Sequence, residues 1–257
     1  MLPRVLLHNS DDGTIGAANR MPDKCDADPE GTKAINVQAT EALAVAANSR
    51  NILLLYISTD YVFPGREGEA PYEAGSPTEP PNFYGKTKLD GENAVLSTTA
   101  KAGLGVVLRI PVLYGKVEES RESAINVLMD SVWKAQEKGA KLLIDDWSIR
   151  YPTNTEDVAR VILDISTKYF HAVDKTALPH VLQFSSEDRM TKYEICEVFS
   201  EIMGLSMDGM AANKQGNDPT SKTQRPYDCH LSTAELKRIG ISVHTQDFKA
   251  WWCVYPA

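Results

Sequence analysis

Asn51-Ile-Leu-Leu-Leu-Tyr-Ile-Ser58 is an unbroken apolar run that ends in a hydroxyl side chain. A run of this kind is typical of a strand buried on both faces of a parallel sheet. A second strand is expected over 105–110, and helices are expected over 28–48 and 82–98. The resulting order of helix, strand, helix and strand predicts an α/β fold with a doubly wound, Rossmann-like parallel sheet.

The chain divides into three expected parts. Residues 1–26 are rich in turn-forming residues and show no regular period, so we expect them to be irregular. Residues 27–145 carry the alternation of helix and strand. Residues 146–257 are expected to form a smaller mixed α/β lobe, which binds substrate and is interleaved with the first part. Further helices are expected over 120–138, 155–170, 191–203 and 232–239, short strands over 141–144 and 180–184, and loops over 64–81 and 213–224.

The composition excludes several classes of function. With 257 residues, 42% hydrophobic and 24% charged, the chain is expected to be a globular cytoplasmic protein. Its net charge of -8 argues against a surface for nucleic acid or for an anionic membrane. The longest apolar runs are too short to span a bilayer. The four cysteines and five histidines show no metal-ligand spacing, so no metal site is predicted and the thiols are expected to be reduced.

Tyr84 and Lys88 are four residues apart in an expected helix, so their side chains share one face. A phenol titrates near pH ~10, and a nearby ammonium lowers that pKa, which makes proton transfer at neutral pH feasible. Thr59 or Ser58, at the carboxyl end of the first strand, would hold a substrate oxygen whose charge changes. The alternative is a surface pair on a helix, because this spacing is common by chance. The hydroxyl side chains upstream favour the catalytic interpretation.

Other residues near this edge of the sheet have both a functional and a structural interpretation. Arg109 ends the second strand and either faces a substrate or pairs with a local carboxylate. Arg225 either holds an anionic ligand or is a solvated loop residue. Tyr61 flanks a pocket or packs under the loop, whereas Asp60 is expected to cap the following turn. The pair Trp251-Trp252 either packs onto the body or anchors a partner.

A dinucleotide needs glycines in a strand-to-helix turn, where backbone N–H groups hold the pyrophosphate. The candidate stretch, Gly13-Thr-Ile-Gly16, has no recognisable strand before it and is interpreted as a chance match. The sequence therefore predicts a proton-transfer centre without the usual phosphate-binding loop.

Several stretches between about Ala17 and Trp252 resemble extended short-chain dehydrogenases of the dTDP-4-dehydrorhamnose reductase type. Within that family, the later stretches are most similar to the regulatory beta subunits of methionine adenosyltransferase. The stretches that carry the resemblance are Ser58–Phe63, Tyr84–Glu92, Leu108–Gly115, Arg150–Ala159, Met190–Glu194 and Gln224–Pro226.

The resemblance implies an NADP-binding fold. It also implies a partner, the catalytic subunit of methionine adenosyltransferase, and a regulatory role in S-adenosylmethionine synthesis. The alternative is an NADP-dependent reductase of a nucleotide-linked 4-keto sugar. By resemblance, Thr59, Tyr84 and Lys88 take the catalytic positions, and Asn36 matches the helix asparagine of the family. The expected cofactor-binding residues are Asn36, Ser58, Tyr84 and Lys88. The expected substrate-binding residues, from their positions in the chain, are Tyr61, Arg109 and Arg225.

The two ends of the chain depart from the family pattern. Members begin with strand–helix units that carry the phosphate loop, and residues 1–16 do not resemble those units. The last residues, 253–257, also differ from the family ending, where partner contact is expected. We therefore expect an N-terminally truncated sheet with weak capture of NADP and lower stability than full-length relatives. The strand at 51–58 is expected to be an unpaired edge, open to pairing with another chain.

Overall fold

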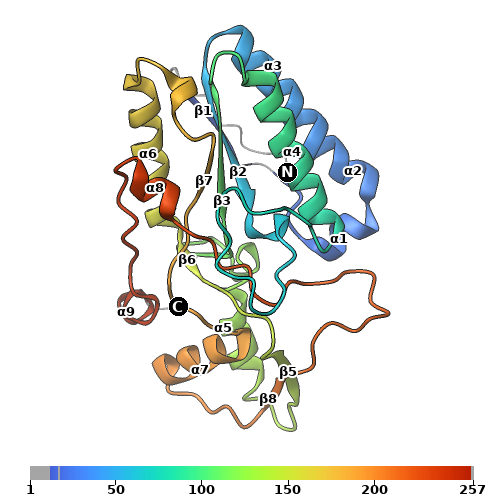
Figure 1. Cartoon of the computed structure of the whole chain (residues 1–257). Coiled ribbons are helices and arrows are strands. Elements are labelled where there is room, and N and C mark those ends of the chain that lie inside the picture. Colours follow the sequence, from blue (N-terminus) through green and yellow to red (C-terminus); the bar gives the residue numbers. More distant parts are fainter. Residues whose placement is uncertain (1–11, 17, 256–257) are drawn as a thin grey trace.

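The computed structural model describes residues 12–16 and 18–255 (Figure 1). Within this part of the chain the main sheet has four strands, all parallel, in the order β1-β2-β3-β7. The strands are β1 (Asp12–Ile15), β2 (Leu53–Thr59), β3 (Gly105–Ile110) and β7 (Val181–Gln183). This order confirms the predicted parallel α/β sheet.

Both faces of this sheet are covered, as the apolar strands β2 and β3 predict. Helices α3 (Thr40–Ser49) and α4 (Phe83–Thr99) lie on one face, and α6 (Thr155–His171) and α8 (Ala234–Arg238) on the other (Figure 1). Successive side chains of a strand point to opposite faces, so β2 divides between two cores. Leu54 and Tyr56 pack toward α3 and α4, whereas Leu53 and Leu55 pack toward α6. The doubly wound arrangement is therefore confirmed.

The helix expected over 28–48 exists but is not regular. Asp28 caps α2 (Pro29–Lys33) by accepting a hydrogen bond from the Gly31 N–H at 3.0 Å. The chain then widens into a π-helical stretch, η1 (Ala34–Ala39), before α3 begins. The buried Asn36 side chain, described below, lies within this stretch.

The expectation of an irregular N-terminal segment is wrong for the residues that the structure describes. Residues 12–15 form β1, which pairs with β2 from Asp12↔Leu53 to Ile15↔Tyr56, and α1 (Pro22–Ala27) follows. Strand β2 is therefore not an unpaired edge, since it lies between β1 and β3. Gly13 lies inside a strand and is no phosphate loop. The strand was missed because Asp-Gly-Thr-Ile is short and half polar; residues 1–11 lie outside the described part.

A second lobe lies at the carboxyl edge of the sheet (Figure 1). Its core gathers aromatic side chains around Tyr114, including Trp251 and Trp252, so the tryptophan pair packs onto the body. The helix expected over 120–138 is shorter and spans only Val127–Lys134. The elements here are α5 (Val127–Lys134), α7 (Lys192–Met203), α9 (Phe248–Val254), β4 (Leu113–Tyr114) paired with β6 (Thr153–Asn154), and β5 (Leu142–Asp145) paired with β8 (Met210–Asn213).

The lobe begins in the chain before residue 146, because α5 and β5 pack within it. The chain then returns to the sheet through α6 and β7. Three short 3-10 turns complete the described elements: η2 (Asp60–Val62), η3 (Ser120–Glu122) and η4 (Lys175–Ala177). In the described residues, no helix is both long and apolar enough to cross a membrane.

Gly91 allows α4 to approach the sheet and the π-helical stretch closely. A Cβ atom added there would lie 2.4 Å from the Tyr56 hydroxyl and 2.8 Å from the Asn36 carbonyl oxygen. Both distances are shorter than a normal carbon contact, so a side chain would force α4 away from its neighbours.

We expect Gly91→Ala to lower the free energy of unfolding by about 1–3 kcal/mol, because overpacking outweighs the better helix propensity of alanine. Urea denaturation measures this change. The control is Gly75→Ala, where an added Cβ meets nothing within 4 Å; its effect should stay within about 0.5 kcal/mol. Equal effects of the two substitutions would contradict the close approach.

Candidate functional site

The predicted residues Thr59, Tyr61 and Tyr84 meet at the carboxyl end of β2. Thr59 ends the strand, and its hydroxyl oxygen accepts a hydrogen bond from the Tyr61 N–H at 3.2 Å. The Tyr84 ring lies edge-on to the Tyr61 ring, with 5.9 Å between centroids. Helix α4 is held here by Asn82, which accepts a hydrogen bond from the Gly85 N–H and donates one to the Gln224 carbonyl.

Lys88 lies one turn further along α4 and is buried. Its Nζ donates a hydrogen bond of 2.7 Å to the Ile57 carbonyl and lies 4.0 Å from the centre of the Tyr56 ring. Burial lowers the pKa of Lys88 to about 7, although the charge of Glu92 acts in the opposite direction. The ammonium is therefore poised to lose its proton near neutral pH.

The pKa of Tyr84 moves in the direction opposite to the prediction. Burial raises the pKa of the Tyr84 phenol, while its contact with the Thr59 hydroxyl lowers it in part. Lys88 does not activate this phenol, because its ammonium is engaged by a backbone carbonyl and an aromatic face, and its own charged form is disfavoured. The expected phenolate at neutral pH is therefore not supported.

Ser58 and Arg109 make side-chain contacts within the interior of the fold. The Ser58 hydroxyl donates to Glu92 Oε1. Arg109 pairs with the same carboxylate through Nε–Oε1 at 2.9 Å and Nη2–Oε2 at 2.7 Å, and its Nη1 donates to the Ala74 carbonyl at 3.1 Å. Arg109 and Glu92 are almost completely buried. Both side chains thus have a local carboxylate partner, which is the alternative given above for Arg109, and the cofactor role of Ser58 and the substrate role of Arg109 stay predictions.

The amide of Asn36 joins three parts of the fold. Its Nδ2 donates to the Thr87 hydroxyl and to the Asn19 carbonyl, both at 3.0 Å, and its Oδ1 accepts from the Asn19 N–H at 2.8 Å. The side chain is fully buried. Asn36 therefore fixes the turn after β1 against α4, and all of its amide hydrogen-bonding atoms are engaged within the protein.

The remaining predicted residues are more loosely placed. Arg225 is half-exposed and pairs with the exposed Asp23 at 2.7 Å. Thr59, and not Asp60, caps the 3-10 turn, and Asp60 Oδ1 accepts the Thr59 hydroxyl at 2.9 Å. Burial raises the pKa of Asp60 to about 6, whereas the Thr59 hydrogen bond and the charge of Arg150 lower it. Arg150 is a site residue that the sequence offered only as part of a family stretch.

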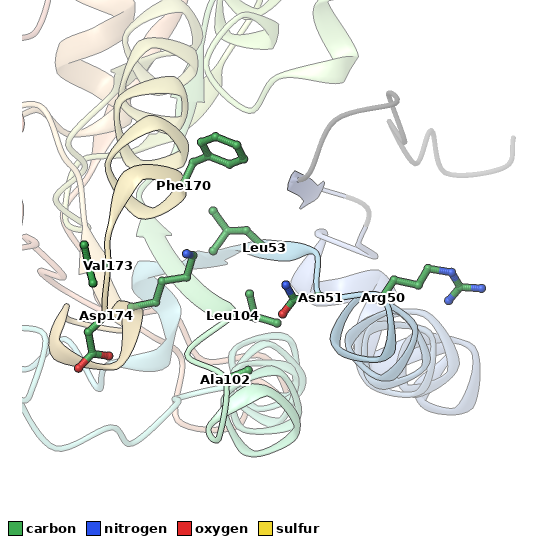
Figure 2. Close-up of a pocket in the computed structure, with 9 residues that line it drawn as sticks. Arg50, Asn51, Leu53, Ala102, Leu104, Phe170, Val173 and Asp174 are labelled. Atoms are coloured by element: carbon green, nitrogen blue, oxygen red, sulfur yellow. The ribbon is translucent and has the colours of Figure 1, made fainter.

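A pocket of about 440 Å³ lies at the opposite, amino edge of the sheet (Figure 2). Leu53, which begins β2, and Leu104, which precedes β3, mark this edge. The exposed Phe170 and Val173 form another side of the pocket. None of the predicted site residues lines it. The candidate site therefore does not coincide with this pocket.

The family is decided by the match of residues 12–250 to the model described as the RmlD substrate binding domain. The chain belongs to the RmlD substrate-binding family. It is 36% identical over 243 residues to methionine adenosyltransferase 2 subunit beta of Xenopus tropicalis, covering 95% of this chain and 67% of that protein. Identity and coverage are the same for the rat protein of that name. The dTDP-4-dehydrorhamnose reductase of Escherichia coli K12 is 28% identical, covering 86% of this chain and 71% of that protein.

Solved structures show the same fold. A dTDP-4-dehydrorhamnose reductase from Clostridium acetobutylicum superposes with a TM-score of 0.77 at 22% identity, covering 95% of this chain and 79% of that chain. The reductase of Bacillus anthracis, in complex with NADP, gives a TM-score of 0.76 at 19% identity, covering 95% and 78%. These findings confirm the predicted Rossmann-like fold and the resemblance on which it was partly based.

The residues of this RmlD-family chain fit only part of a dinucleotide. Tyr84 and Lys88 stand where the carboxyl edge of a parallel sheet receives ligands. Among residues 12–16 and 18–255, however, no glycine-rich turn leads from a strand into a helix at that edge. Lys88 Nζ is also already bound to the Ile57 carbonyl. The described part thus lacks the backbone N–H groups that hold a pyrophosphate. It also contains no group of acidic, histidine or cysteine side chains that could hold a metal ion.

We expect Arg109→Met to lower the free energy of unfolding by about 3–5 kcal/mol, because Glu92 would remain as a buried, unpaired charge. The double variant Glu92→Met/Arg109→Met should lose less than the sum of the two single variants. Urea denaturation of all three gives the coupling energy. The control Arg238→Met removes an exposed ion pair to Glu235 and should cost at most about 1 kcal/mol. Additive losses would contradict the buried pair.

The lowered pKa of Lys88 makes stability depend on pH. The unfolded chain keeps this proton up to about pH 10.5, whereas the folded protein releases it near pH 7. Between these values the unfolded state binds more protons, so the contribution of Lys88 to stability rises with pH. From pH 7 to pH 9, the wild type should gain about 2 kcal/mol relative to Lys88→Met. Denaturation of both proteins across this range measures it, and a constant difference would refute the lowered pKa.

Proposed function

We propose that this chain is a non-catalytic subunit that binds the catalytic subunit of methionine adenosyltransferase and regulates it. The observation that carries the proposal is the 36% identity to subunit beta of methionine adenosyltransferase 2 over 95% of the chain. The reductase of Escherichia coli is less similar and aligned over less of the chain. A cytoplasmic location belongs to the same proposal, and the free cysteines agree with it.

The geometry of the site supports a binding role over a catalytic one. Lys88 points its ammonium at a backbone carbonyl, and the phenol of Tyr84 has a raised pKa. The phenol of Tyr84 is therefore not prepared for proton transfer at neutral pH, and Lys88 makes its hydrogen bond within the protein. The expected cofactor is NADP. We propose that any NADP binding by this chain is weak, since the described residues supply contacts for one end of the molecule only.

A reductase of a nucleotide-linked 4-keto sugar is the second candidate, and the meeting of Thr59 with Tyr84 favours it. In that case Tyr84 would donate a proton to the substrate oxygen, and the Thr59 hydroxyl would position that oxygen. Lys88 would tune the phenol only if its ammonium left the Ile57 carbonyl.

The two candidates differ in what Tyr84→Phe does. Purified chain mixed with the catalytic subunit at micromolar concentration should elute as a complex in size-exclusion chromatography, and Tyr84→Phe should elute in the same way. Oxidation of NADPH in the presence of dTDP-4-dehydrorhamnose should stay at background for both proteins. Failure to form a complex would contradict the subunit role. Turnover by the wild type that falls about 100-fold or more in Tyr84→Phe would establish the reductase.

A further inference from the structure

Helix α6 carries apolar side chains on two opposite faces. Val158, Val161 and Ile165 face the sheet and are buried in its core. The opposite face also carries large apolar side chains, since Leu163 is 66% and Phe170 is 52% exposed. Within the described part of the chain, neither of them belongs to a hydrophobic core. Exposed apolar side chains that gather along one line, and are not scattered singly, indicate a surface for interaction.

The spacing along this outer face is that of a contact between two helices. We call outer row the five positions separated by four, three, four and three residues, which are Ala159, Leu163, Ser166, Phe170 and Val173. Four of them are exposed, and Ser166 is buried. A 4-3 spacing keeps side chains along one line of a helix, where a second helix packs. From Ala159 to Phe170 the outer row extends for about 16 Å, at 1.5 Å per residue. The partner that fits it is therefore a helix.

The sizes of these side chains make the outer row complementary to a second copy of itself. Ala159 and Ser166 are small, whereas Leu163 and Phe170 are large. When two copies of α6 lie antiparallel with Leu163 opposite Ser166, Ala159 comes to lie opposite Phe170. Each large side chain then meets a small one. A parallel pair would instead place the large side chains against each other and the small ones against each other, which packs less evenly.

The charges at the two ends of α6 favour the same direction. The exposed Glu156 lies in the first turn and the exposed Lys168 in the last turn. Lys175 follows at the pocket of the amino edge, which Phe170 and Val173 also line (Figure 2). In an antiparallel pair, Glu156 of one copy comes to lie at this basic end of the other, and the opposite ends of the two helix dipoles meet. A parallel pair would bring like charges together.

We propose that a second copy of this chain packs its α6 antiparallel against α6 along the outer row, so that the protein forms a dimer with twofold symmetry. A twofold interface uses the same patch on both partners, and the outer row is such a patch. Helix α6 begins directly after β6 in the second lobe and ends near the pocket of the amino edge. Antiparallel packing therefore directs the two candidate sites to opposite ends of the dimer. The proposal goes beyond the role as a subunit and does not depend on it.

Sedimentation velocity of the whole chain, over a wide range of protein concentration, tests the interface. The wild type should change from monomer to dimer with a micromolar dissociation constant, because one pair of helices buries less area than a standard interface. Leu163→Glu places a carboxylate in the contact on both sides and should raise the dissociation constant at least about tenfold. The control is Val45→Glu, because Val45 is a 54% exposed residue of α3 on the other side of the sheet. It adds the same charge and should leave the dissociation constant unchanged.

Charge reversal tests the antiparallel direction. Glu156→Lys and Lys175→Glu should each raise the dissociation constant about two- to fivefold, because each removes an attraction between the two copies at the rim of the contact. The double variant exchanges the two charges and should return to a dissociation constant near that of the wild type. In a parallel pair Glu156 would face Glu156 of the other copy, so the double variant would restore nothing.

Several results would overturn the proposal. A wild type that stays monomeric at every concentration has no such interface. A dimer that Leu163→Glu and Val45→Glu leave equally intact is formed by another surface, and a double variant that restores nothing rejects the antiparallel direction. A monomer whose melting temperature falls in Leu163→Glu but not in Val45→Glu indicates that the chain covers the outer row itself. All of these measurements use this chain alone, so their failure leaves binding to the catalytic subunit of methionine adenosyltransferase untouched.

Discussion

The buried pair of Glu92 and Arg109 holds the candidate site in place. Glu92 lies on α4, Arg109 on β3, and the Ser58 hydroxyl on β2 donates to the same carboxylate. Three elements are therefore joined at one point below the surface. Because Lys88 lies one helical turn before Glu92, this connection also determines how far Lys88 reaches under the end of β2. The position of Lys88 therefore depends on a buried ion pair that lies one helical turn away from it.

The fold accommodates the positive charge of three buried side chains at this end of the sheet in three different ways. Arg109 is fully paired and stabilises the packing of α4. Lys88 has no carboxylate in contact, and the protein accommodates it by lowering its pKa. Arg150 cannot lose its proton at accessible pH, because a guanidinium remains charged in proteins. Arg150 therefore keeps its charge at a buried position without a carboxylate in contact among the described residues.

The sequence predicted elements where one pattern extends over many residues. The apolar runs of β2 and β3, and the helices α4, α6 and α7, were found because burial repeats along them. Strand β1 was missed because four residues, two of them polar, carry no period. The site was predicted in part: Thr59, Tyr61 and Tyr84 do come together. The partners of Ser58, Asn36 and Arg109 could not be predicted, since each bond joins residues at least 17 apart in the chain.

The path of the chain between the sheet and the second lobe limits how the protein can be divided. After β3 the chain enters the lobe, returns through α6 and β7, enters it again at α7, returns for α8, and ends in the lobe at α9. Neither lobe is a continuous piece of sequence, so no single cut releases one intact. Loss of α9 would expose the aromatic core around Tyr114, and loss of everything after α6 would remove a strand from the sheet. The two lobes are therefore made and degraded together.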